Sequence, residues 1–220
     1  MPIRWNERGA AAAIICLFVC SACSGTSGGS KPAETAAAPA APPAAESPAP
    51  GTHRVVGKAP AAVSGMSSII VLEPKEPHEF PAQADRPAMD QVTQTFVPAI
   101  LFVRTGQPTD FKNSDDVLHN VRVRNADTRE GTFNVAIPTG QIYTHTFDRD
   151  GFYDIGCDIH PGMSAQVIAT TSPYATLADP DGSFYFEDVA PGAYKVTIYS
   201  GTERQEKSIE VAEAITTVGS

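Results

Sequence analysis

From Arg54 onward the chain consists of short runs of β-type residues, and this spacing limits the fold more than any other feature. The runs are separated by Gly, Pro, Asn and Asp, which favour turns. No stretch carries apolar residues at sustained helical spacing. Strand signals at regular short intervals predict an all-β protein built as a β-sandwich. The runs expected to form its strands are 55–56, 69–72, 96–103, 109–113, 119–124, 141–148, 152–157 and 164–170.

Residues 1–22 have the layout of a secretory signal peptide. Two arginines precede an apolar run from Ala10 to Val19, which is too short to span a bilayer. Ser-Ala then precedes Cys23, which resembles the lipobox of bacterial lipoproteins, although Cys20 stands where Leu is usual. We expect cleavage before Cys23 and a lipid on that residue; ordinary signal cleavage nearby is the alternative. Ser24, rather than Asp, after the cysteine favours the outer over the inner membrane.

Residues 23–52 are nearly all Ala, Pro, Gly, Ser and Thr, without apolar periodicity. Such a segment cannot bury a core, and we expect a disordered, extended linker. A lipid at Cys23 followed by this tether predicts a location in the bacterial periplasm or cell envelope, with the folded part anchored to a membrane.

Removal of the signal would leave Cys157 as the only free thiol among the four cysteines. No internal disulfide could form in such a chain. In an oxidising compartment a lone thiol is liable to oxidation unless it is buried or ligated. We favour ligation.

The mature chain would be strongly acidic. Subtracting Arg4, Arg8 and Glu7 from 16 basic and 25 acidic residues leaves 14 against 24, a net charge of −10. This balance argues against nucleic acid and anionic lipid as partners. It fits a basic protein partner and, at least equally well, a merely solvated acidic surface.

Residues 174–213 form a second group of strand signals. An Asp-Pro-Asp-Gly turn at 179–182 precedes alternating aromatic residues, and a Pro-Gly turn at 191–192 precedes the alternating run 194–199. The group resembles the carboxypeptidase regulatory-like (prealbumin-type) β-module in Asp-x-Asp-Gly-x-Phe and Pro-Gly-x-Tyr.

About 40 residues are too few to bury a stable core alone. Residues 55–56 and 69–72 otherwise lack a domain, so we expect them to supply the missing strands. The hypothesis is a discontinuous module of residues 53–88 and 172–213, with a second domain at 89–171 inserted into it.

The stretch from Gly151 to Met163 holds an uncommon set of side chains. Cys157, His160 and Met163 form Cys-x-x-His-x-x-Met, which places a thiolate, an imidazole and a thioether on one short loop. This donor set suits copper better than other common metals. His119 is the obvious second histidine, since strand alternation puts it on the core-facing side with Val121.

Two other interpretations of these residues compete with a copper site. A lone cysteine in a β-domain is usually a small buried hydrophobe, and a nearby methionine is usually packing. Zinc could bind two histidines and a thiolate, but a structural zinc site normally adds a fourth Cys or His. The methionine favours copper. The remaining histidines, including His145 on a strand, read as ordinary residues.

At these positions the chain resembles the cupredoxins, small blue-copper proteins such as plastocyanin and amicyanin. The matching motifs are Phe111-x-Asn113-x-Asp115, His119-Asn120-Val121 and Gly151-x-Tyr153-x-x-x-Cys157-x-x-His160-x-x-Met163. The resemblance implies a Greek-key β-sandwich that holds one type 1 copper. It implies His119, Cys157 and His160 as a trigonal plane and Met163 as a weak axial ligand.

The same resemblance implies that Asn113 is the asparagine that braces the two ligand loops; the alternative is a turn residue at a strand end. Residues 89–91 and 96–98, together with the regulatory-like tail, also resemble periplasmic methylamine-utilisation proteins. In cupredoxins electrons usually pass through the C-terminal histidine, which is His160 here.

The leading functional interpretation is an electron-transfer protein that carries one electron between protein redox partners, and not an enzyme. No Ser-His-Asp order, paired-carboxylate motif or phosphate loop compels an enzymatic reading, and five histidines are too few for the extra centres of a multicopper oxidase. Two further classes stay open. One is copper delivery without redox cycling, modestly disfavoured by the few methionines. The other is an adhesion or scaffold module with a structural metal site.

Overall fold

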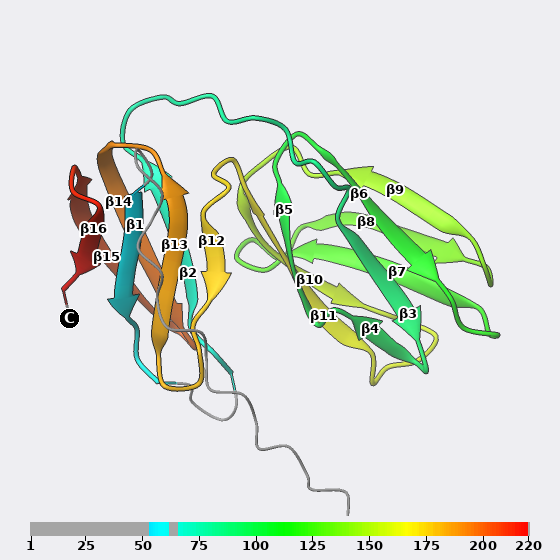
Figure 1. The fold of residues 1–220 in the computed structure, drawn as a ribbon. Helices are drawn as coiled ribbons and strands as arrows, with labels where there is room; N and C mark the ends of the chain where they lie inside the picture. The colour runs from blue at the N-terminus through cyan, green and yellow to red at the C-terminus, as the bar shows by residue number, and fades with distance from the viewer. Residues whose placement is uncertain (1–52, 62–65, 220) are drawn as a thin grey trace, which may run out of the picture. The chain divides into compact units, whose positions relative to one another are not determined.

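The computed structural model describes residues 53–61 and 66–219, and the regular elements in these ranges are strands (Figure 1). The expected all-β class is therefore confirmed. The predicted signal peptide, the lipid on Cys23 and the linker 23–52 fall outside the described residues. Within the described ranges, no helix has the length and apolar character needed to cross a membrane.

Strands β3 to β11 build two packed sheets. One sheet has the order β5-β11-β10-β7-β8 and the other the order β4-β3-β6-β9, so the chain passes back and forth between them. The bounds are β3 (Ala88–Val92), β4 (Thr95–Val97), β5 (Ile100–Arg104), β6 (Pro108–Asn113), β7 (His119–Asn125), β8 (Gly131–Ile137), β9 (Ile142–Thr146), β10 (Gly151–Gly156) and β11 (Ser164–Thr170).

Alternation along the strands produces the core of this sandwich. In β7, Val121 and Val123 are fully buried, while the alternate residues Arg122 and Arg124 are more exposed. Each such buried side chain contributes about 1.5–3 kcal/mol relative to an exposed one. Cys157 and Met163 belong to the same core cluster.

Residues 96–103, expected to form one strand, are divided between two sheets. Strand β4 ends at Val97 and β5 begins at Ile100, because Pro98 lacks the N–H group that a continuous ladder needs. Phe96 and Val103 consequently reach the core from opposite sheets. Strands β3 and β8 were not anticipated from the sequence.

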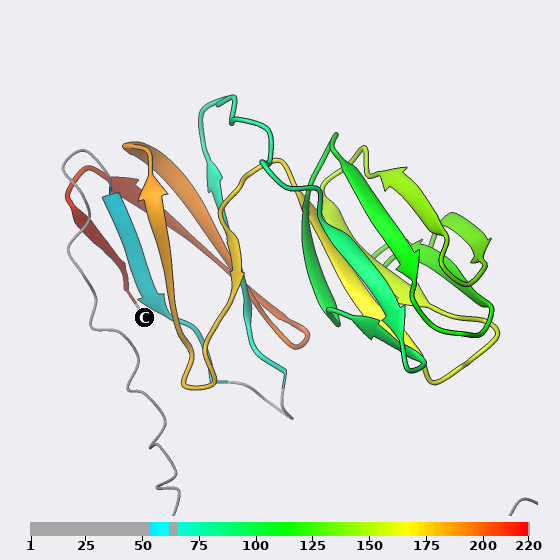
Figure 2. The ribbon, with the colours of Figure 1, turned by 45° about the vertical axis from the view of Figure 1, so that its right-hand side comes forward.

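A second sandwich combines strands from both ends of the described chain. Its sheets have the orders β13-β1-β16 and β12-β2-β14-β15, and in Figure 2 the cyan β1 runs between the orange β13 and the red β16. The bounds are β1 (His53–Lys58), β2 (Ile69–Pro74), β12 (Ala175–Leu177), β13 (Ser183–Val189), β14 (Gly192–Ser200), β15 (Glu203–Val211) and β16 (Ile215–Val218).

The pairing in this sandwich joins residues more than a hundred positions apart. Leu72 of β2 lies opposite Val196 of β14, and Ile70 lies opposite Ile198. These strands share a hydrophobic core separate from that of β3 to β11. Strand β16 extends the fold beyond residue 213, where the sequence placed the end of the regulatory-like module.

Candidate metal centre

Three of the predicted ligands meet at one end of the β3–β11 sandwich. His119 is the first residue of β7, Cys157 directly follows β10, and His160 lies in the loop between β10 and β11. The antiparallel pairing of β10 with β7 brings the end of one strand beside the start of the other. The side chains of His119 and Cys157 are almost inaccessible to solvent, with residue exposures of 0% and 2%.

The donor atoms of these residues form a compact triangle. Cys157 Sγ lies 3.9 Å from Nδ1 of both His119 and His160, and the two Nδ1 atoms are 3.0 Å apart. The point equidistant from all three lies about 2.1 Å from each, within the roughly 2.0–2.3 Å range of Zn–N and Zn–S bonds. A first-row metal ion therefore fits without movement of the donors, and the thiolate with imidazoles suits copper.

Met163 closes the loop that carries two of these donors. Its N–H donates to the carbonyl of His160 at 3.0 Å, and the N–H of Cys157 donates to the carbonyl of Met163 at 3.3 Å. The Met163 side chain is buried in the same cluster as Cys157. Its role as axial ligand stays a prediction.

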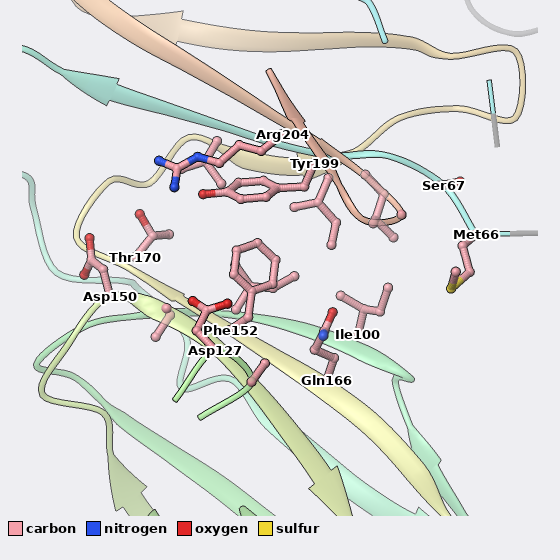
Figure 3. A pocket seen from close by; sticks show the side chains of 18 of the residues that line it. Met66, Ser67, Ile100, Asp127, Asp150, Phe152, Gln166, Thr170, Tyr199 and Arg204 are labelled. Atoms are coloured by element: carbon pink, nitrogen blue, oxygen red, sulfur yellow. The ribbon is translucent and has the colours of Figure 1, made fainter. Parts of the chain in front are cut away.

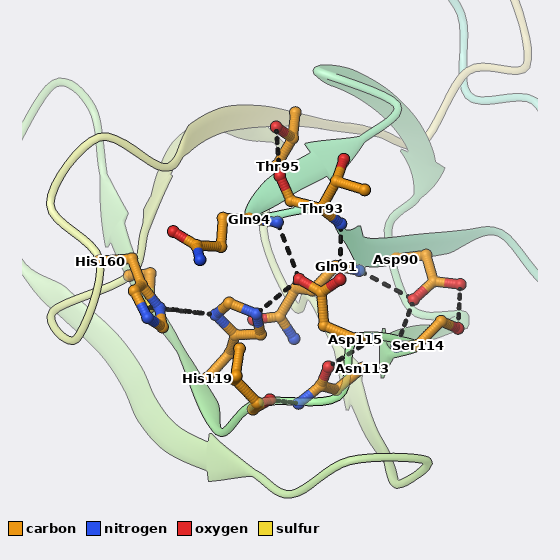
Figure 4. A network of polar contacts seen from close by, with 12 residues as sticks. Asp90, Gln91, Thr93, Gln94, Thr95, Asn113, Ser114, Asp115, His119 and His160 are labelled. Carbon is orange, nitrogen blue, oxygen red and sulfur yellow. Dashed lines mark hydrogen bonds and ion pairs between the residues drawn. The ribbon is translucent and has the colours of Figure 1, made fainter.

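A carboxylate holds the far side of the His119 ring. Nε2 of His119 lies 2.9 Å from Oδ2 of Asp115 (Figure 4). A carboxylate only accepts, so Nε2 of His119 is the donor in this contact. Hydrogen bonds from the backbone N–H of Gln94 and from His119 hold the pKa of Asp115 below its ordinary value.

The bracing between the ligand loops that was predicted for Asn113 is made by another asparagine. Asn113 donates to the carbonyls of Val117 and Ile137 and accepts from the N–H of Asp115, so its bonds do not reach the Cys157 loop. This geometry fits its alternative interpretation as a turn residue. The bridge comes from Asn120, the residue after His119.

Asn120 joins β7 to the Cys157 loop through both ends of its side chain. Its Oδ1 accepts the N–H groups of Asp158 at 2.7 Å and Ile159 at 3.3 Å, and lies 3.3 Å from Cys157 Sγ. Its Nδ2 donates to Asn134 and Asp158. The hydrogen bond from Asn134 has the largest effect in lowering the pKa of Asp158, and a hydrogen bond from Arg122 lowers it further.

No role was assigned to Asn120 or Asp115 from the sequence, although the position of each relative to His119 indicates that it could contact the metal site. Asn120 immediately follows the proposed ligand, and Asp115 precedes it by four residues. Both belonged to the motifs of the cupredoxin resemblance, but without an assigned role.

Outside this triangle, the described residues contain no other group of three or more His, Cys, Asp or Glu side chains placed to hold a metal ion. The ring of His145 packs against Phe133 and Phe147, and burial lowers its pKa. A cavity of about 940 Å³ has Phe152, Ile168 and Tyr199 in its lining, and none of the predicted ligands (Figure 3).

Residues 85–170 match the family described as copper binding proteins, plastocyanin/azurin family. The sandwich formed by β3 to β11 is thus a cupredoxin sandwich, as the sequence predicted. The match covers this part of the chain and does not reach the second sandwich. No curated protein matches the chain.

Several solved structures are similar to part of the chain. A purple cupredoxin from Nitrosopumilus maritimus is 21% identical over 38% of this chain and 99% of its own, with a TM-score of 0.35. Amicyanin from Paracoccus versutus is 21% identical over 45% and 97%, with a TM-score of 0.36. A copper-containing nitrite reductase from Thermus scotoductus is 23% identical over 46% of this chain but 26% of its own, with a TM-score of 0.37.

Proposed function

We propose that this protein binds one type 1 copper and carries single electrons between redox partners. The observation that carries the proposal is the buried triangle of His119, Cys157 and His160, whose sides of 3.0 to 3.9 Å suit one metal ion. These three residues, together with Met163, would hold the copper. Bound copper supplies a one-electron couple between its Cu(II) and Cu(I) states.

The surroundings of the triangle favour electron transfer because they limit movement. Asp115 fixes the ring of His119, and Asn120 fixes the backbone of the Cys157 loop. Donors held by hydrogen bonds in a packed core cannot rearrange freely when the charge of the metal changes. His160 is only partly buried and lies beside the exposed Ile159, which makes its ring the proposed route for electrons.

Two other functions make different predictions. A copper-delivery protein would release its metal to a partner and would need an exchangeable site, whereas two of the three donors here are inaccessible to solvent. The similar nitrite reductase is a copper enzyme, which keeps catalysis as a second candidate. We favour a carrier for two reasons. The described residues hold one group of side chains placed to bind a metal ion, and none of its three donors lines the cavity beside Phe152 or the one beside Tyr143, where a substrate could bind.

We further propose a cellular setting from the sequence. The chain would be exported, lipidated at Cys23 and anchored in the bacterial cell envelope, with the outer membrane favoured, and its redox partner would be a basic protein. The second sandwich would be a regulatory-like module, which is also where a scaffold role would reside. Mass spectrometry of the protein from native membranes tests the anchor: an unmodified N-terminus after residue 22 would contradict it.

Copper titration of the chain from residue 24 tests the site. We expect an intense blue absorption and a narrow-hyperfine paramagnetic signal at one copper per chain. Cys157→Ser abolishes both, whereas the control His145→Gln, outside the triangle, retains them. A colourless adduct, or stronger binding of zinc, would contradict a type 1 site. Reversible voltammetry then separates a carrier from a delivery protein, because only a carrier must cycle without losing its metal.

A further inference from the structure

The carboxylate of Asp115 sits in an unusual place for an acidic side chain. Its exposed fraction is 12%, and it lies against the fully buried ring of His119. A partly buried carboxylate is costly unless hydrogen bonds compensate it. The structure supplies them, and they come from a segment of the chain distant from the metal ligands.

Backbone groups of the β3–β4 turn converge on this carboxylate. The N–H of Thr93 donates to Oδ1 at 2.6 Å, and the N–H of Gln94 donates to Oδ2 at 2.8 Å (Figure 4). Both residues have positive φ angles, 50° and 55°. This backbone conformation is disfavoured for any residue with a side chain, and more so for a β-branched threonine. The turn therefore accepts strain while it presents two donors to one carboxylate.

The same hairpin also forms hydrogen bonds with Lys112 and Ser114, which precede Asp115 in the chain. Asp90 accepts hydrogen bonds from the N–H and the hydroxyl of Ser114, and Gln91 donates from its side chain to the carbonyl of Lys112. These bonds fix the backbone on the N-terminal side of Asp115. The hydrogen bonds from the hairpin β3–β4 thus hold the Asp115 carboxylate in one position and one orientation.

We propose that Asp115 is a positioning residue that fixes the proton of His119 on Nε2, turns Nδ1 toward the metal and lowers the reduction potential of the centre. The last part of this inference rests on the proposed copper function. A negative charge stabilises the more positive Cu(II) state more than Cu(I). A carboxylate on the outer nitrogen also raises the basicity of an imidazole ligand.

The first test needs no copper. Nitrogen NMR of the metal-free protein reports which ring nitrogen of His119 carries the proton. We expect the Nε2–H form, with a proton that exchanges slowly with water, in the unmodified protein. In Asp115→Asn the fixed tautomer is lost or the Nε2 proton exchanges at least tenfold faster. An Nδ1–H form in the unmodified protein overturns the proposal.

The second test measures copper binding in both oxidation states. In Asp115→Asn we expect Cu(II) affinity to fall by roughly 10- to 100-fold, the range for loss of such a partner. Cu(I) affinity should fall less. A tenfold larger loss for Cu(II) raises the reduction potential by about 59 mV.

Two control variants separate this role from general effects. Asp158→Asn removes a carboxylate beside Cys157 that does not contact the His119 ring, and it should shift the potential less. Thr93→Gly relieves the positive φ but keeps the N–H donor, so the potential should stay at the unmodified value. An unchanged potential in Asp115→Asn, or an equal shift in Asp158→Asn, overturns the proposal. If the protein binds no copper while Asp115 still fixes the tautomer, the proposed function fails and the positioning role stands.

Discussion

Asn120 is the residue whose removal most directly tests how the two ligand segments are joined. Asn120→Ala deletes the acceptor of two backbone N–H groups, those of Asp158 and Ile159, in a residue that is 6% exposed. A donor left without a partner costs about 1–3 kcal/mol. The hydrogen bond from the N–H of Ile159 is long, at 3.3 Å, and Ile159 is 46% exposed. Water can therefore replace the lost acceptor at this N–H. The short 2.7 Å bond of Asp158 carries most of the effect.

We expect the local free energy of opening at Asp158 to fall by about 2 kcal/mol in the metal-free protein, a roughly 30-fold acceleration of amide hydrogen exchange. Exchange measured by NMR at single residues is the right assay, because a chain with two sandwiches need not unfold in one step. Asn134→Ala is the matched control. It removes a partner of the Asn120 side chain but leaves both backbone donors bonded, and should cost about 0.5–1.5 kcal/mol. An acceleration below threefold in Asn120→Ala, or equal effects of the two variants, would refute the reasoning.

Three further predictions concern stability. Gly182→Ala would place a Cβ 2.2 Å from the carbonyl of Ala59 at a φ of +88°, and should destabilise the second sandwich in denaturant by at least 1–3 kcal/mol; Gly106→Ala, at a φ of +81° but in open space, should cost about 1 kcal/mol. Burial lowers the pKa of His145 below 6.5, so the unfolded chain binds more protons, and stability should fall as pH drops from 6.5 through the folded pKa. Denaturant midpoints across this window should depend less on pH in His145→Gln, and equal slopes would exclude the effect. Leu72→Ala, in the fully buried core of the second sandwich, should lower its stability by about 2–5 kcal/mol and leave any blue absorption unchanged; loss of the colour would show that the two cores are coupled.

The sequence sufficed for those parts of the fold and site that depend on local pattern. Period-two alternation placed His119 with Val121 on the buried face of β7, as the structure has them. The loop from Cys157 to Met163 could be recognised as a candidate metal site from the unusual set of side chains it carries. Both kinds of evidence lie within a few positions of the chain.

The contacts around the site could not be predicted in this way, since they join distant segments. Asp115 meets Thr93 across 22 residues, and Asn120 meets Asp158 across 38. Such bonds depend on which strands pair, and alternation does not specify pairing. Strand β3 of the hairpin that supports Asp115 was itself missed, because one of its two buried positions holds the polar Gln91 and its apolar alternation is therefore incomplete.

The division at residue 98 has a similar origin. An apolar run of eight residues is consistent with one buried strand or with two strands in different sheets. A proline within such a run is the available signal, and its missing N–H decides between the two.

The pairing of β2 with β14 has a consequence for the order of events during synthesis. Strand β2 ends at Pro74, but its partner begins at Gly192, and β1 pairs with strands that begin at Ser183 and Ile215. All strands of the cupredoxin sandwich emerge between these two sets. Since segments fold as their partners become available, the cupredoxin sandwich would be complete before the partners of β1 and β2 are made. We therefore expect a nascent chain stopped after residue 171 to contain the folded cupredoxin core, with β1 and β2 still unpaired because their partner strands have not been made.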